Sequence, residues 1–118
     1  MRAVNQDRGT ELATAVARAA TFWSRLQGLR GRSRFENGQG LWIVPCRGVH
    51  TSGLAFDIDV LFLDADRRVV AAEERMKPGR MSRIFWRARS VLELPAGTVR
   101  RSETRVGDQI QFVVAEAV

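Results

Sequence analysis

The stretch "IDVLFLDADRRVVAAEE", residues 58–74, decides the fold class. Apart from one acid, residues 58–63 are apolar on both faces of a strand, which is typical of a strand inside a sheet. Residues 64–66 form a turn signal, and residues 67–74 continue as a second β-type run. The two runs predict an antiparallel hairpin whose loop is slightly longer than the tightest type.

Other short β-type runs surround this hairpin, each bounded by turn residues. Residues 10–19 fit a strand or an Ala-rich helix equally well. One short helix is expected over 21–30, because Thr21 can cap it and the apolar residues Phe22, Leu26 and Leu29 share one face. The predicted fold is α+β: a small, mainly antiparallel β domain, either a curled sheet or an open barrel, with further strands in "LWIVP", "SVLELPAG" and "GDQIQFVVAEA".

Length and composition predict one soluble domain. The chain has 118 residues, of which 1–8 are expected to be a mobile start and 9–118 a single globular domain. One cysteine cannot close an internal disulfide, and no apolar run approaches the ~18–20 residues of a membrane span. We therefore expect a cytoplasmic protein without membrane insertion.

The charge is strongly basic and segregated along the chain. The formal net charge is +6, carried almost entirely by arginine, with Lys77 as the single lysine. Between Lys77 and Glu93 there is no acid, whereas arginines alternate with Phe85 and Trp86. Guanidinium groups beside exposed aromatics suit single-stranded nucleic acid. The alternative is an arginine-rich composition with those aromatics closing the end of a barrel, and the scarcity of lysine favours it.

Cys46 and His50 are the only cysteine and histidine in the chain. A thiolate activated by imidazole is a catalytic arrangement. Four residues of extended chain would separate the two by about 13 Å, so they meet only if the chain turns between them. A core cysteine is favoured. A zinc site is excluded by the ligand count, and we expect neither a metal nor a cofactor.

Asp59 lies in a strand with apolar residues on both faces, where an unpaired carboxylate is costly. It should therefore find a donor, and two alternatives follow. It forms an acid–base dyad with His50, or it caps the strand start and holds the preceding loop. The structural alternative is favoured. The segment 91–108 is expected to be architectural, with Glu93 paired to an arginine.

The blocks "GLRGR", "GQGLWIVPCRGVHT", "IDVLFLD", "RRVVAAEERMKPGR", "SVLELPAG" and "VGDQIQF" occur in this order. The chain resembles the prokaryotic family known as domain of unknown function 192, over roughly residues 9–113. The resemblance implies a compact, mostly β single domain and no particular activity. Asp59 matches the aspartate of the family's Pro-Leu/Ile-Asp segment, whereas Asp57 stands where proline is expected.

The functional prediction is a binding or accessory module for an unknown small ligand or a protein partner. Its site is placed at the loop 46–54 with Asp59, flanked by the basic segment 77–89. The first alternative is a small enzyme with His50 and Asp59 as its catalytic pair. The second is a nucleic-acid-binding module that uses segment 77–89. The candidate binding residues are His50, Thr51, Asp59, Arg80 and Arg83.

Overall fold

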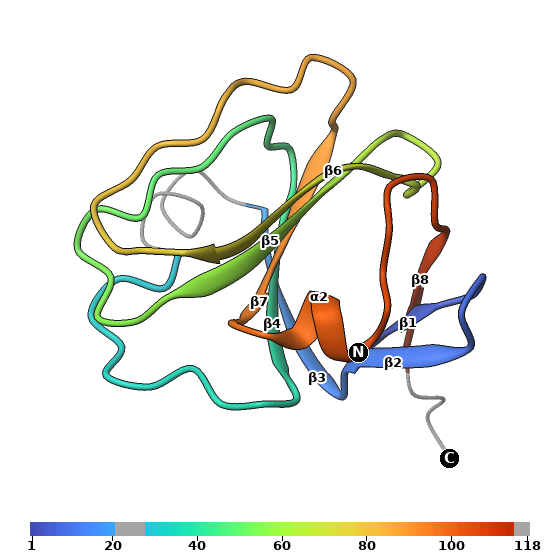
Figure 1. The fold of residues 1–118 in the computed structure, drawn as a ribbon, viewed down its shortest axis with the longest axis horizontal. Coiled ribbons are helices and arrows are strands. Elements are labelled where there is room, and N and C mark those ends of the chain that lie inside the picture. The colour runs from blue at the N-terminus through green and yellow to red at the C-terminus, as the bar shows by residue number, and fades with distance from the viewer. Residues whose placement is uncertain (21–27, 115–118) are drawn as a thin grey trace.

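The computed structural model describes residues 1–20 and 28–114. Within these ranges the strands form two open sheets (Figure 1). The five-stranded sheet has the order β3-β4-β7-β5-β6, and the three-stranded sheet the order β2-β1-β8. The elements are β1 (Arg2–Asn5), β2 (Thr10–Ala13), β3 (Ala15–Ala19), β4 (Gln39–Ile43), β5 (Ile58–Leu63), β6 (Val69–Met76), β7 (Ser90–Pro95), α2 (Thr98–Arg101) and β8 (Ile110–Val113).

The central strands β5 and β7 are antiparallel neighbours and are buried along their whole length. On one face, Leu61 and Leu92 belong to a core that is shared with β1, β2, β8 and α2. On the other face, Val60 and Val91 belong to a second core, closed by partly buried side chains of the long loops. Figure 1 shows these loops on the side of the five-stranded sheet opposite the three-stranded one. Burial on both faces explains why β5 and β7 are almost wholly apolar.

The predicted fold class is confirmed, because the regular secondary structure of the described chain is mostly strand, in open, mainly antiparallel sheets. The predicted hairpin is β5-β6, whose turn is held by Asp64: its Oδ1 accepts hydrogen bonds from the N–H groups of Asp66 and Arg68, both 2.9 Å long. The ambiguous residues 10–19 form two strands, β2 and β3. The pairing of β3 with β4 is parallel, which the mainly antiparallel expectation did not specify.

Two local expectations differ from the structure. Residues 2–5, expected to be mobile, form β1, the middle strand of the three-stranded sheet, because Ala3 and Asn5 are buried against β2 and β8. The helix expected over 21–30 lies mostly outside the described residues, and 28–31 form a turn. A short helix, α2, follows β7, at a position where only a turn was predicted.

Asn5 anchors the three-stranded sheet through its buried side chain. Its Nδ2 donates to Thr104 Oγ1 and Asp108 Oδ2, both at 3.0 Å, and its Oδ1 accepts from the N–H groups of Asp7 and Arg8 at 3.1 Å. Although burial raises the pKa of Asp108, hydrogen bonds from Asn5 and Arg8 hold it below its ordinary value. One amide thus connects the β1–β2 turn to the start of β8.

We predict that Asn5→Ala lowers the free energy of unfolding by about 2–4 kcal/mol, because it leaves several buried polar groups without partners. The matched control is Gln6→Ala, which removes an exposed amide from the next position and should change stability by less than about 0.5 kcal/mol. Urea denaturation of both variants measures the difference. Equal losses in the two variants would contradict the assigned role of Asn5.

Candidate functional site

Asp59 is fully buried, and its carboxylate is saturated by backbone groups. Its Oδ1 accepts a hydrogen bond from the N–H of Arg75 at 2.9 Å, in the β6 bulge opposite Asp59. Its Oδ2 accepts from Gly97 at 3.1 Å and from Val99, in the first turn of α2, at 2.8 Å. The carboxylate therefore ties together three elements, β5, β6 and α2.

Thr51 is also fully buried and joins the two long loops. Its Oγ1 donates to the carbonyl of Lys77 at 2.6 Å and accepts from the N–H of Arg80 at 2.8 Å. Its backbone N–H donates to the carbonyl of Arg80 at 2.8 Å. Loop 46–54 and segment 77–89, adjacent in the predicted site, do lie side by side. The hydroxyl and backbone N–H of Thr51 are themselves hydrogen-bonded to backbone groups of Lys77 and Arg80.

The structure does not bring His50 and Asp59 together. His50 is exposed and forms a bridge with Met81, whereas Asp59 is buried and its three partners are backbone N–H groups. Cys46 is half-buried, and its Sγ donates to the carbonyl of Gly48 at 3.0 Å. Arg80 and Arg83 are exposed. In the described residues, no three His, Cys, Asp or Glu side chains are grouped as a metal site.

Glu93, in the middle of β7, is a second buried acid of the central strands. Its register partners are Leu41 on β4 and Val60 on β5, so it lies on the face covered by the long loops. Within the described chain, no hydrogen bond reaches its carboxylate. Burial raises the pKa of Glu93 to about 7, opposed only by the positive charge of Arg32. The expected arginine partner is thus near, although it forms no direct ion pair.

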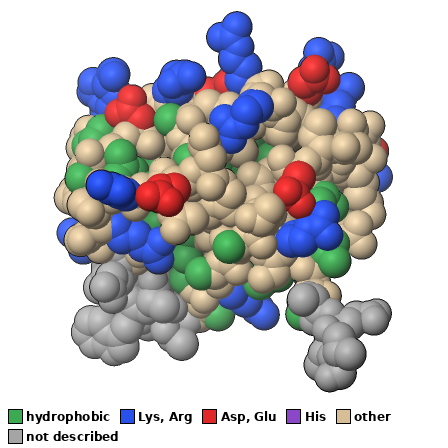
Figure 2. All heavy atoms as spheres, turned by 90° about the horizontal axis from the view of Figure 1, so that it is seen from below, with side chains coloured by type: hydrophobic (Ala, Val, Ile, Leu, Met, Phe, Trp, Pro, Cys, Tyr) green, Lys and Arg blue, Asp and Glu red, His purple; other side chains and the backbone are tan. Residues whose placement is uncertain are grey.

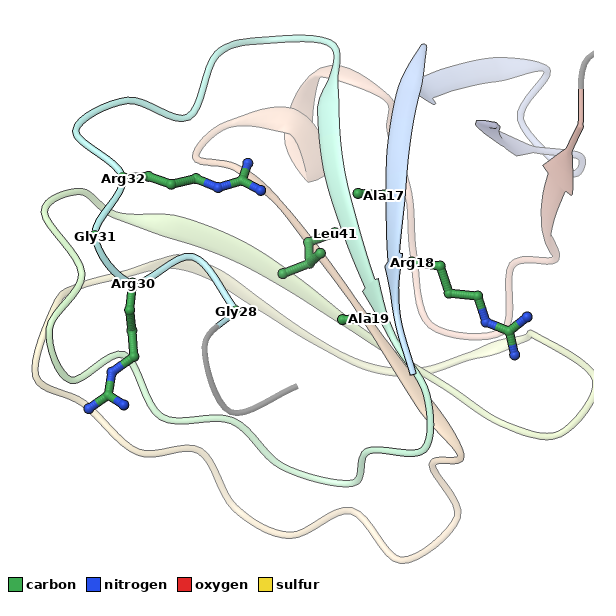
Figure 3. A pocket seen from close by; sticks show the side chains of 8 residues that line it. All are labelled: Ala17, Arg18, Ala19, Gly28, Arg30, Gly31, Arg32 and Leu41. Atoms are coloured by element: carbon green, nitrogen blue, oxygen red, sulfur yellow. The ribbon is translucent and has the colours of Figure 1, made fainter. Parts of the chain in front are cut away.

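An open pocket of about 460 Å³ lies over this part of the sheet. Figure 3 shows it between the 28–32 turn and strands β3 and β4, with Leu41 on its floor. The Arg32 side chain extends from the turn toward β4, whereas those of Arg30 and Arg18 point away from the pocket (Figure 3). The pocket lining therefore combines an apolar floor with the Arg32 guanidinium. Glu93 is not among the lining residues, but its register partner on β4, Leu41, is.

The sequence analysis missed Glu93 as a site residue, although a signal was present. Glu93 is the single acid inside an otherwise apolar strand, the same signal that singled out Asp59. Strand alternation places an acid on a face, but it does not say whether that face supplies hydrogen-bond donors. Only the tertiary structure shows that Asp59 accepts three backbone hydrogen bonds whereas Glu93 accepts none within the described residues.

The fold and site define a small β-rich single-domain protein with an open pocket and, on the neighbouring strand, a buried acid that accepts no hydrogen bond within the described residues. The model of the family DUF192, "Uncharacterized ACR", matches residues 3–112, and the chain belongs to this family. The resemblance inferred from the sequence is therefore confirmed. In the described residues, no helix is long and apolar enough to cross a membrane.

Similar proteins agree with this assignment. A "UPF0127 protein" of Thermococcus gammatolerans is 31% identical over 121 residues, which cover 96% of this chain and 76% of the relative. One of Thermococcus sibiricus is 29% identical, with coverage of 96% and 75%.

Two crystal structures share the fold. A protein of unknown function from Novosphingobium aromaticivorans has a TM-score of 0.84 at 19% identity, covering 95% of this chain and 84% of that one. A putative transcription regulator from Sinorhizobium meliloti has a TM-score of 0.78 at 25% identity, with coverage of 93% and 89%.

We predict that Asp59→Asn lowers the free energy of unfolding by about 2–4 kcal/mol, because an amide cannot accept all three hydrogen bonds. Asp57→Asn is the matched control two residues away. Asp57 forms a surface ion pair with Lys77 at 3.6 Å, so its loss should cost less than about 1 kcal/mol. Denaturation curves compare the two variants. An Asp59→Asn protein as stable as the wild type would rule out the anchoring role.

The raised pKa of Glu93 predicts that the free energy of unfolding depends on pH. A group whose pKa is raised on folding contributes stability that is present below its unfolded pKa and is lost as the pH rises through the folded value. For Glu93 this window runs from about 4.5 to about 7. Between about pH 5 and about pH 8 the protein should therefore lose about 2–3 kcal/mol of unfolding free energy through this group.

Glu93→Gln should remove this loss, whereas Glu74→Gln, the same change at an exposed position of β6, should retain it. Chemical denaturation at the two pH values measures the difference for each protein. Parallel pH profiles for the wild type and Glu93→Gln would show that Glu93 is not the titrating group.

Proposed function

We propose that the protein is a binding module for a small polar ligand, which enters the pocket beside Glu93 and Arg32. The observation that supports this most directly is Glu93: the residue is 5% exposed, burial raises its pKa to about 7, and its carboxylate accepts no hydrogen bond within the described chain. Buried polar groups are almost always hydrogen-bonded, and an unpaired one is an energetic cost. A ligand that donates to Glu93 would remove this cost.

The chemistry of the pocket restricts the ligand. Glu93 accepts hydrogen bonds when ionised, whereas Arg32 only donates them. The complementary ligand has an N–H or O–H donor for Glu93 and a nearby carboxylate, carbonyl or hydroxyl acceptor for Arg32. Free amino acids, primary amides and polyols fulfil this requirement. The apolar floor at Leu41 leaves room for a short aliphatic part.

This proposal keeps the binding role expected from the sequence and moves its site. Asp59 and Thr51 are already saturated by backbone groups, so neither offers a vacant hydrogen-bonding position to a ligand. Glu93 accepts no hydrogen bond within the described chain, and its register partner Leu41 lines the pocket, so we place the ligand there. The site consists of Glu93, Arg32 and Leu41.

We predict that at least one member of a panel of free amino acids, primary amides and polyols raises the melting temperature saturably. A ligand that binds only the folded state stabilises it in proportion to RT ln(1 + [L]/Kd). The shift should be abolished in Glu93→Gln and in Arg32→Ala. Glu74→Gln and Arg34→Ala, exposed positions of the same residue types, should respond as the wild type does.

Differential scanning fluorimetry followed by calorimetric titration of the active compound makes this measurement. The proposal fails if no panel member shifts the wild type. It also fails if the shift persists in Glu93→Gln, because the ligand would then bind elsewhere.

A further inference from the structure

The two long loops form a hydrogen-bonded ribbon, residues 46–51 paired with residues 79–89, which we call the loop ribbon. Backbone hydrogen bonds connect its segments, among them Phe85 N–H to the Arg47 carbonyl at 2.9 Å, Ser82 N–H to the Val49 carbonyl at 2.8 Å and Thr51 N–H to the Arg80 carbonyl at 2.8 Å. In Figure 1 the two segments are the long loops opposite the three-stranded sheet. This surface is thus an ordered platform, built by backbone pairing outside the two sheets.

The inner side of the loop ribbon is fixed to the core. The ring of Phe85 packs against Phe62 of β5, with centroids 4.4 Å apart. At Gly48 a Cβ would lie 2.9 Å from Ile84 Cδ1, so the two segments approach each other closely at this point. Packing on this side holds the outward side chains in a defined arrangement without help from a partner.

The outer side is basic and contains no acid. Neither segment of the loop ribbon includes Asp or Glu, and five exposed arginines are distributed over both: Arg47, Arg80, Arg83, Arg87 and Arg89. On the face shown in Figure 2, acidic side chains lie among the basic ones. The loop ribbon contributes basic side chains and no acidic ones.

Large apolar side chains are exposed between these arginines. Met81 is 82% exposed, Ile84 52% and Trp86 75%. They alternate with Arg80, Arg83 and Arg87 along the segment. An exposed indole beside guanidinium groups has a free π-face for stacking and cations for phosphates within the same few residues.

We propose that the loop ribbon binds single-stranded nucleic acid, with its arginines on the phosphates and Trp86 stacked on a base. The guanidinium fork matches phosphate oxygens, and stacking on indole tolerates any base. Binding is therefore salt-dependent and has little sequence preference. A membrane surface is the competing occupant, but membrane-surface binding typically uses a continuous apolar face, usually on a helix, and here arginines interrupt the apolar side chains.

This surface is distinct from the pocket at Glu93. No residue that lines the pocket belongs to the loop ribbon. Variants in the loop ribbon therefore leave Glu93 and Arg32 unchanged, so the two proposals are tested separately.

The test measures binding of fluorescein-labelled oligo-dT and oligo-U, each about 15 nucleotides long, by anisotropy over a range of salt concentrations. Arg83→Ala/Arg87→Ala should weaken binding by tenfold or more. Its salt slope should be less steep by about 1.4, because each lost phosphate contact on a single strand removes about 0.7. Trp86→Leu, which keeps an apolar side chain, should weaken binding roughly tenfold through lost stacking.

The matched control is Arg100→Ala/Arg105→Ala, which removes the same charge from exposed positions outside the loop ribbon. It should retain nearly wild-type affinity. The proposal is overturned if this control loses as much affinity as Arg83→Ala/Arg87→Ala, since net charge alone would then explain binding. It is also overturned if the oligonucleotides do not bind, or if Trp86→Leu has no effect. Vesicles of anionic phosphatidylserine that bind more tightly than either oligonucleotide would identify a membrane surface instead.

Discussion

The carboxylate of Asp59 is the interaction on which the arrangement of β5, β6 and α2 depends. It accepts three backbone N–H bonds while fully buried, so it compensates its own desolvation and satisfies three donors that would otherwise lack partners. Gly97 makes this geometry accessible. Its φ of 94° is in the left-handed region, which glycine adopts without strain, and its N–H points at the carboxylate. Replacing either residue disturbs both sheet and helix.

Glu93 lies in the same sheet as Asp59, but its carboxylate accepts no hydrogen bond within the described residues. Asp59 is paired in register with Leu94, so it and Glu93 are neighbours on adjacent strands but lie on opposite faces. The face of Asp59 contains the bulge of β6 and the first turn of α2, both of which present backbone N–H groups. On the face of Glu93 the register partners Leu41 and Val60 have apolar side chains, and no hydrogen bond to the carboxylate forms within the described residues. The raised pKa of Glu93 follows from this difference.

The long loops have two roles in this arrangement. Their inner side chains close the second core, and Thr51 fixes the loops to each other by backbone hydrogen bonds. The outer side chains of the loop ribbon and the groups that line the pocket at Arg32 remain accessible to solvent. Such a division suits the binding roles proposed above, because polar groups held in a rigid frame lose less conformational entropy when a ligand binds.

The sequence by itself determined the β5–β6 hairpin, the strands β4, β7 and β8 and the family, because alternation, turn residues and motif order are local properties of the chain. It also located a buried acid at Asp59. The tertiary structure decided that β1 is a middle strand, that His50 and Asp59 are apart, and that Glu93, unlike Asp59, accepts no hydrogen bond within the described residues. These outcomes depend on which distant backbone groups face a side chain, and no local pattern encodes that.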